Sequence, residues 1–132
     1  MEKINIKTDR RIQLIDITKD IQQIVSKSKI KEGVCFLFCP HTTAGLTINE
    51  NYDPSVRRDI QETINNLIPG NKNYLHTEGN ADSHIKSTLF GSSLLIFIEE
   101  GRLCFGNWQG VFFCEFDGPR QREVWLRIIC QS

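Results

Sequence analysis

The stretch VCFLFCPHTTAGLTINENYDP, residues 34–54, contains the signals that decide the fold. Its first six residues are apolar, with β-branched and aromatic side chains, which is typical of a short buried strand. Pro40 ends this strand because proline cannot donate a hydrogen bond to a sheet ladder. The turn HTTAG leads into a second short strand over residues 46–49. Asp53-Pro54 then predicts the start of a helix, since a capping carboxylate precedes a proline at the first helical position.

Elements of both kinds are predicted around this stretch. Residues 11–17 are rich in Ile and Leu and predict a strand. Thr18 is a candidate cap for a helix that extends to about residue 29, and we expect Gly33 to end it. The helix that starts at Asp53 is expected to end at Pro69-Gly70.

Strands dominate the second half of the chain, after a short helix over residues 81–90. Residues 94–98 are apolar at every position, so we expect both faces of this strand to be covered. Residues 103–105 are expected to pair with 111–117 around a turn, and residues 123–130 form the last strand. These elements predict a mostly antiparallel α+β fold with two or three helices, as a single domain over residues 1–132.

Composition and charge exclude several classes of protein. Sixteen basic residues balance sixteen acidic residues, so a nucleic-acid partner is not expected. The longest apolar runs are far shorter than the ~20 residues of a membrane helix, so no membrane association is expected. The first residues, MEKINIKTDRR, do not resemble a signal peptide, and we expect a cytoplasmic protein.

The five cysteines form no C-x-x-C pair, which argues against a disulfide framework or a zinc ribbon. Cys35, Cys104, Cys114 and Cys130 lie in strand-like runs, and we expect them to be buried as small hydrophobic side chains. Cys39 lies near His41 in the sequence, which leaves a thiolate nucleophile as a further hypothesis. That role requires contact with a base and a lowered thiol pKa.

All three histidines lie in polar segments. His41 opens the HTTAG turn, and His76 and His84 belong to HTEGNADSH. Such histidines are candidate ligands of a divalent metal ion, Zn or Mg, or candidate acid–base groups near neutral pH. The alternative is that the second segment only caps a helix, with Asn80 or Asp82 as the cap.

The same segments suggest a binding site for an anion. His84 is expected in the first turn of its helix, where backbone N–H groups and the helix dipole favour negative charge. His41, Thr42 and Thr43 offer further donors. A phosphate or a carboxylate would suit both segments.

The segment VFFCEFDGPR, residues 111–120, places two carboxylates on one face of a strand. Alternation assigns Phe112, Cys114 and Phe116 to the core, and Phe113, Glu115 and Asp117 to the other face. Glu115 and Asp117 would lie about 7 Å apart by strand rise. If buried, the pair would act as an acid–base group or as metal ligands, whereas on a wet surface it would form ion pairs with Arg120.

Two more clusters complete the set of candidate residues. Glu50 and Asn49 lie just after a strand, where they are either site residues or part of a turn. Trp108 and Gln109 are expected at a hairpin tip, where the indole could stack on a flat ring or pack on a strand.

Three motifs in order resemble the YjbQ family, also called the secondary thiamine-phosphate synthase family. They are CPHTTAGLTINENYDPSVRRDI, HTEGNADSHIKSTLFG and GRLCFGNWQGVFFCEFDGPRQREV. The resemblance implies a compact α+β protomer with a two-layer sheet arrangement, assembled as a homotrimer. It also implies a pocket near a subunit interface that is lined by His41, Thr42, Thr43, Asn49, Glu50, His76, Asn80, His84, Gln109, Glu115, Asp117 and Arg120.

The activity that this resemblance implies is a weak thiamine-phosphate synthase reaction, which joins hydroxymethylpyrimidine pyrophosphate to hydroxyethylthiazole phosphate and releases pyrophosphate. His41, His84, Glu115 and Asp117 would be catalytic, with a divalent cation at the carboxylates and no organic cofactor. The expected partner is thus a small phosphorylated molecule. One alternative is a non-catalytic trimer that binds a metal ion or small anion at its histidines, and another is a structural trimer.

Overall fold

The computed structural model describes residues 1–131. In chain order its elements are β1 (Glu2–Lys7), β2 (Gln13–Asp16), α1 (Thr18–Ser28), β3 (Gly33–Phe38), β4 (Ala44–Glu50), α2 (Pro54–Leu67), α3 (Ala81–Phe90), β5 (Ser93–Glu99), β6 (Arg102–Leu103), β7 (Gln109–Glu115) and β8 (Gln121–Cys130).

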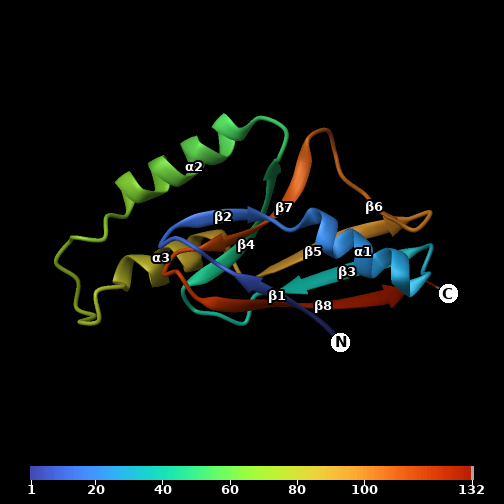
Figure 1. Cartoon of the computed structure of the whole chain (residues 1–132), viewed down its shortest axis with the longest axis horizontal. Helices are drawn as coiled ribbons and strands as arrows, with labels where there is room; N and C mark the ends of the chain where they lie inside the picture. The colour runs from blue at the N-terminus through green and yellow to red at the C-terminus, as the bar shows by residue number, and fades with distance from the viewer. Residues whose placement is uncertain (132) are drawn as a thin grey trace.

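The strands form two antiparallel sheets that share one core (Figure 1). The larger sheet has five strands in the order β1-β8-β3-β5-β6, and the smaller has three in the order β2-β7-β4. Cys35 and Leu37 of the larger sheet pack in the same apolar cluster as Val111 and Phe113 of the smaller one. The predicted α+β, mostly antiparallel arrangement is therefore confirmed.

Helix α1 packs Ile21 and Val25 into this core. The Asp16 carboxylate accepts the Thr18 backbone N–H at 2.9 Å, so Asp16 rather than Thr18 caps the first turn. The helix ends at Lys29, which adopts a left-handed conformation with φ 61°. The prediction that Gly33 ends the helix is wrong: Gly33 begins β3, where a Cβ atom would lie 2.2 Å from the Ile129 carbonyl oxygen.

Helix α2 confirms the predicted start and end. The Asp53 carboxylate accepts the Ser55 backbone N–H at 2.9 Å, and the helix ends at Leu67, just before Pro69-Gly70. Figure 1 shows α2 lying outside the smaller sheet. Its Ile60 packs on a second, smaller apolar cluster that contains Phe112 and Phe116.

Strand β7 is buried on both faces, because α2 and α3 cover one face and the main core covers the other. The prediction that only the Phe112 face is core is therefore incomplete. The predicted pairing of residues 103–105 with 111–117 is wrong: β6 pairs with β5, and β7 lies between β2 and β4. Sequence reasoning also missed β1, which pairs with β8 and presents only two apolar side chains to the core, Ile4 and Ile6.

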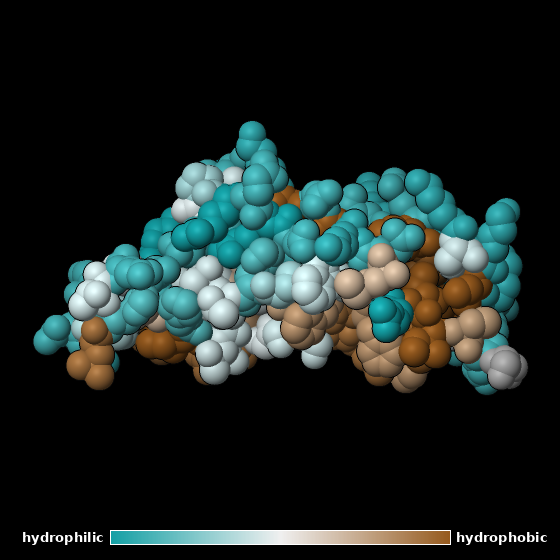
Figure 2. Space-filling model, turned by 90° about the horizontal axis from the view of Figure 1, so that it is seen from below, coloured by the Kyte–Doolittle hydropathy of each residue, from teal (hydrophilic) through white to brown (hydrophobic). Residues whose placement is uncertain are grey.

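The larger sheet is covered on one face only. Ile96 and Ile98 point into the core, but Leu95 and Phe97 are 49% and 60% exposed. Within a single chain, therefore, only one face of β5 is covered, and the expectation that both faces are covered is wrong. Phe36, Phe38 and Ile129 are exposed beside them, and we call these five residues the outer apolar face. Figure 2 shows hydrophobic side chains gathered over the part of the molecule that holds this sheet.

The cysteines are all free. Cys35, Cys39 and Cys114 are buried, whereas Cys104 is partly exposed and Cys130 is exposed. The burial predicted for Cys104 and Cys130 is thus not found, because both lie near strand ends at the margin of the larger sheet. Among residues 1–131, no helix is long and apolar enough to cross a membrane.

Candidate functional site

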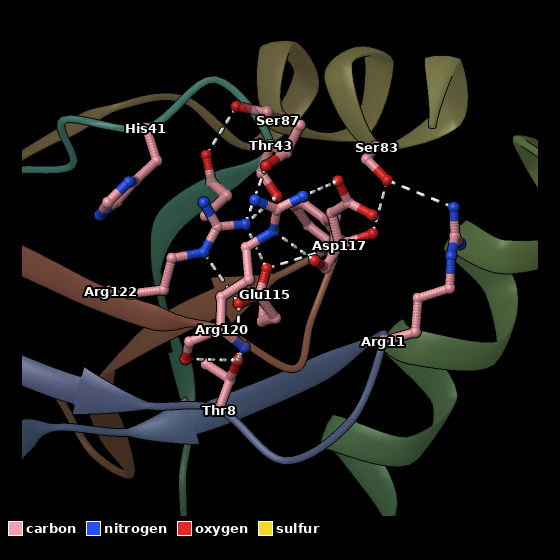
Figure 3. Close-up of polar contacts among 12 residues, drawn as sticks. Thr8, Arg11, His41, Thr43, Ser83, Ser87, Glu115, Asp117, Arg120 and Arg122 are labelled. Carbon is pink, nitrogen blue, oxygen red and sulfur yellow. Dashed lines mark hydrogen bonds and ion pairs between the residues drawn. The ribbon is translucent and has the colours of Figure 1, made fainter. Parts of the chain in front are cut away.

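The region that holds most of the predicted site residues is organised by a buried ion pair (Figure 3). Glu115 is the last residue of β7, and Arg122 lies near the start of β8. The Arg122 Nε donates to Glu115 Oε1 at 2.8 Å, and a second guanidinium nitrogen bonds Glu115 Oε2. The Arg122 guanidinium also donates to the Thr43 hydroxyl at 2.8 Å, so the pair joins the two sheets.

The Glu115 carboxylate is fully occupied by protein donors. Besides Arg122, the Thr8 hydroxyl donates to Oε1 at 2.7 Å and the Asp117 backbone N–H donates to Oε2 at 3.0 Å. Burial alone would raise the pKa of this carboxyl, but the hydrogen bonds from Arg122, the Asp117 amide and Thr8 outweigh burial and lower it. A carboxylate has about four acceptor positions, and all are taken here. Glu115 is therefore an ionised anchor in this arrangement, rather than the acid–base group or metal ligand that the sequence suggested.

Asp117 belongs to a separate, more exposed cluster. Arg120 donates to the Asp117 carboxylate at 2.9 Å and to its backbone carbonyl at 2.8 Å. The Asn80 side-chain amide donates to the same carboxylate oxygen at 2.8 Å. The guanidinium of Arg120 is half-exposed, so this cluster presents a positively charged group at the surface, beside the N-terminus of α3.

Helix α3 is fixed to the sheets by buried polar contacts. Asp82 is fully buried and accepts hydrogen bonds from Arg11 at 2.9 Å and from Lys86 at 2.8 Å. Burial would raise the pKa of Asp82, but the hydrogen bonds from these two cations lower it to about 2. The hydroxyls of Ser83 and Ser87 donate to the carbonyls of Phe116 and Ala44, respectively. These contacts set the orientation of the helix and of its histidine.

The predicted caps of α3 are not formed. Asn80 occupies the N-cap position but makes no side-chain hydrogen bond to the helix, because its amide binds Asp117. Asp82 binds Arg11 and Lys86 instead. His84 lies in the first turn as expected, and its backbone N–H is already bonded to the Asn80 carbonyl.

His41 and His84 line a common hollow of about 430 Å³, which we call the histidine hollow. The other lining residues are small and include several hydroxyls. Across residues 1–131 the lining contains no acidic side chain; it consists of His41, Thr42, His84, Ser87, Thr88, Gly91 and Ser92. His76 lies on the other side of His84, with their ring centres 5.2 Å apart.

His41 is held by the backbone of β8. Its Nε2 lies 3.0 Å from the Glu123 backbone nitrogen and 3.1 Å from the Glu123 carbonyl oxygen. Burial, and then the charge of Arg122, lower the pKa of His41. The imidazole is therefore neutral at pH 7, with Nδ1 as its second polar atom.

The predicted site of three histidines is not formed within one chain. His76 and His41 line different hollows, and only His84 borders both. In the described chain, residues 1–131, no three His, Cys, Asp or Glu side chains are close enough together to hold a metal ion. The Cys39 nucleophile is not supported either, since burial raises the pKa of its thiol.

The remaining predicted residues lie at the opposite end of the β4–β7 pair. Ala44 is opposite Glu115, whereas Glu50 is opposite Gln109. At about 3.4 Å per residue, the two ends lie about 20 Å apart. We call Asn49, Glu50, Trp108 and Gln109 the distal group. Trp108 is 62% exposed, and the Gln109 side chain accepts the Gly106 backbone N–H at 2.7 Å. One chain therefore does not bring all the predicted site residues together.

Comparison with known proteins decides the family. The family model described as "UPF0047 protein YjbQ-like" matches residues 2–131. The chain belongs to the YjbQ family. It is 54% identical to the UPF0047 protein MJ1081 of Methanocaldococcus jannaschii over 96% of this chain and 92% of that protein. It is 41% identical to the UPF0047 protein YugU of Bacillus subtilis, over 98% of each.

Solved structures agree with this YjbQ-family fold. A protein from Clostridium acetobutylicum, described as an uncharacterized conserved protein of the YjbQ/UPF0047 family, is 48% identical and superimposes with a TM-score of 0.95 over 98% of this chain and all of that one. A YbjQ-like protein of unknown function from Sulfolobus solfataricus is 34% identical, with a TM-score of 0.93. These relatives share the fold, and their descriptions assign no reaction.

Sequence reasoning missed several residues that organise this YjbQ-family site. Arg122 alternates with Val124 and Leu126 and so lies on the same face of β8. A charged residue on an otherwise apolar face predicts a buried ion pair, and this pattern could have identified Arg122. Thr8 gave no such signal, because its partner Glu115 is far away in the sequence. Lys86 follows Asp82 by four residues on α3, a spacing that was a usable signal.

Proposed function

We propose that this YjbQ-family protein binds a small phosphorylated molecule in the histidine hollow. The observation that carries the proposal is the lining of the hollow. Of the described residues, 1–131, those that line it offer imidazoles and hydroxyls, and none of them is a carboxylate. Arg120 lies at the start of α3, where its guanidinium is paired with Asp117, and it does not line the hollow. The imidazoles and the Thr42 and Ser92 hydroxyls are donors that suit an oxyanion, whereas the Ser87 and Thr88 hydroxyls already donate to the carbonyls of Ala44 and His84.

The reaction we propose for this site is the secondary thiamine-phosphate synthase reaction. The thiazole nitrogen of hydroxyethylthiazole phosphate attacks the methylene carbon of hydroxymethylpyrimidine pyrophosphate. The carbon–oxygen bond to pyrophosphate breaks, and pyrophosphate leaves with the electron pair. The hydroxyl of Thr42, the ring of His84 and the Arg120 guanidinium would stabilise the departing charge. The three histidines do not meet within one chain among residues 1–131, so protein donors alone hold the pyrophosphate in this proposal.

A second candidate is binding without catalysis. It is favoured by one observation: one chain does not gather the residues predicted for the reaction, since Glu115 is held as an anchor and the distal group lies about 20 Å from it along the β4–β7 pair. In that case the histidine hollow would hold a phosphorylated ligand, or a metal ion completed by another copy, and would perform no reaction.

We further propose that the protein acts as a homotrimer. The support is the outer apolar face, whose Phe97, Leu95 and Ile129 are about half-exposed in one chain. A large contiguous apolar surface is typical of an interface. A neighbouring copy could also bring its distal group to the histidine hollow, which one chain cannot do because the two ends of the β4–β7 pair lie about 20 Å apart.

The reaction is tested by incubating the protein with both substrates and measuring thiamine phosphate by mass spectrometry. We expect product from the unmodified protein and a loss of about 100-fold or more for His84→Ala. Lys7→Gln, an exposed change on β1, is the matched control and should retain full activity. Binding of hydroxyethylthiazole phosphate without any product would favour the non-catalytic candidate. If the protein neither forms product nor binds hydroxyethylthiazole phosphate, both the catalytic and the non-catalytic candidate are contradicted.

A composite site is tested by mixing two inactive variants. His84→Ala alters the histidine hollow, and Gln109→Ala alters the distal group. If a site combines the hollow of one copy with the distal group of the next, random mixing of the two variants should leave both parts intact in about one site in four. Mixing His84→Ala with His41→Ala should recover nothing, since both change the same hollow. Equal results from the two mixtures would contradict a site shared between copies.

A further inference from the structure

A second hollow of about 700 Å³ lies between α1 and the turn that joins β5 to β6. Figure 1 places both elements at the opposite end of the molecule from α3. Its floor is apolar and includes Val25, Leu103 and Phe105. Its rim carries charged side chains. The charged residues are Lys19, Lys29, Lys31, Glu100 and Arg102, and because four of these five are cations we call this hollow the cationic groove.

The rim concentrates positive charge in a chain that has no net charge. Four cations line the groove against one carboxylate, Glu100. Across residues 1–131, the basic residues in ion pairs are Arg11, His76, Lys86, Arg120 and Arg122. None of the four groove cations is among them. Cations gathered without a carboxylate partner repel one another, and an anionic ligand would relieve that repulsion.

Other carboxylates lie near the groove. Asp16 accepts the backbone N–H of Thr18, a lining residue, at 2.9 Å. Glu32 accepts the Glu100 backbone N–H at 3.1 Å. Glu99 is the partner of Arg102 in the β5–β6 register, but their charged groups are not within ion-pair distance in the described chain. The positive charge on the rim is therefore only partly balanced from within the protein.

The walls of the groove are held in place by hydrogen bonds. The Gln22 amide donates to the Gly101 carbonyl at 3.1 Å and accepts the Leu103 backbone N–H at 3.0 Å, so α1 is tied to the hairpin. The Gly101 backbone N–H donates to the Lys31 carbonyl at 3.0 Å, which ties in the segment after α1. The groove is therefore preformed, and a ligand would not need to order it.

Two rim residues occupy backbone positions that favour glycine. Lys29 has φ 61° and Glu100 has φ 52°. A side chain in this left-handed region costs free energy that glycine avoids. Lys29 caps the end of α1 and Glu100 begins the turn between β5 and β6, so these local structures account for both conformations, and both residues line the groove.

We propose that the cationic groove binds a small organic molecule with two or more phosphate groups. Its volume lies within the range of small-molecule sites, and a concave shape suits a small molecule better than a flat macromolecular surface. The rim cations bind the phosphates, and Phe105 and Leu103 offer an apolar floor to the organic part. The proposal is independent of the histidine hollow, because the two hollows share no residue.

The test uses ATP as the probe, titrated into the ¹⁵N-labelled protein and followed by NMR. We expect shifts of the amide signals of residues 29–31 and 100–103, and we expect the same shifts in a His84→Ala variant. Lys29→Gly with Arg102→Gln removes two cations and should weaken ATP binding about tenfold or more. Glycine suits the backbone of position 29, so this variant should fold. Lys7→Gln is the control for one exposed cation and should bind ATP within about twofold of the unmodified protein.

Three results would overturn the proposal. One is an absence of ATP binding. Another is a set of shifts confined to the histidine hollow and lost in His84→Ala. The third is equal weakening by Lys7→Gln and by the groove variant, because that would indicate non-specific attraction. If a heparin oligosaccharide binds the groove while ATP does not, the surface serves a macromolecular polyanion and the proposal is also wrong.

Discussion

Glu115 and Arg122 show how one pair of residues sets the chemistry of the whole region. The pair is buried, joins the two sheets and lies next to His41 and Asp117 in structure. Sequence alternation placed Glu115 and Asp117 on one face, but β7 ends at Glu115, and Asp117 beyond it belongs to a separate, more exposed cluster. Their different environments could not be predicted, because Arg122 and Thr8 reach Glu115 from distant parts of the chain.

Removing the charge of Arg122 should destabilise the fold strongly. Arg122→Met leaves the Glu115 carboxylate buried without its cation, and we expect a loss of about 3–5 kcal/mol in the free energy of unfolding. Arg120→Met is the matched control, since Arg120 is half-exposed and its ion pair contributes about 1 kcal/mol or less. Urea denaturation measures both. Similar losses for the two variants would contradict the anchoring role of Glu115.

The Asp82 carboxyl predicts how stability depends on pH. Its pKa is lowered from 3.8 to about 2, so the unfolded chain binds the proton more tightly than the folded one. This contribution is therefore fully present above about pH 4 and is lost as the pH falls through 2. It amounts to about 2 kcal/mol. Unfolding free energies measured between pH 5 and 2 should fall less steeply for Asp82→Asn. An unchanged slope would show that Asp82 is not the group responsible.

At the scale of elements, the sequence predicted those with local signals. Helix α2 begins with its own cap and ends at its own proline and glycine, so both bounds were found. Strand β6 was assigned the wrong partner because pairing depends on which strands the fold brings together, and residues 103–105 have no local preference for β5 over β7. The predicted site residues fall into two separate groups for the same reason. Their residue types were predictable, but the register of the β4–β7 pair sets the distance between the distal group and Glu115.

The cap of α2 gives a test at this scale. Asp53→Ala removes the hydrogen bond to the Ser55 backbone N–H and should lower both the free energy of unfolding and the Tm. Asp59→Ala removes an exposed carboxylate from the middle of the same helix and should cost less. Thermal unfolding of the two variants, followed by circular dichroism, compares them. An equal decrease in Tm would contradict the capping role.

The whole molecule has an apolar surface that one chain leaves open. The outer apolar face is exposed on the larger sheet, and Figure 2 shows hydrophobic side chains gathered over this part of the molecule. The sequence predicted a cover for both faces of β5, and no other element of the described chain, residues 1–131, covers Leu95 and Phe97. A homotrimer would supply that cover and would bring the distal group of one copy to the next.

Introducing a charge on this surface should therefore dissociate the assembly. Phe97→Lys places a cation in the outer apolar face, and we expect analytical ultracentrifugation to show a monomer where the unmodified protein sediments as a trimer. Tyr52→Lys changes another exposed aromatic residue outside this face and should leave the trimer intact. A trimer that survives Phe97→Lys would locate the interface elsewhere.

A crystal structure of the protein grown with pyrophosphate tests most directly whether the histidine hollow binds phosphorylated molecules. We expect pyrophosphate density within hydrogen-bonding distance of His84 and Thr42, with the distal group of a neighbouring copy facing the ligand. Density found only in the cationic groove, together with a histidine hollow that holds no pyrophosphate, would contradict this proposal.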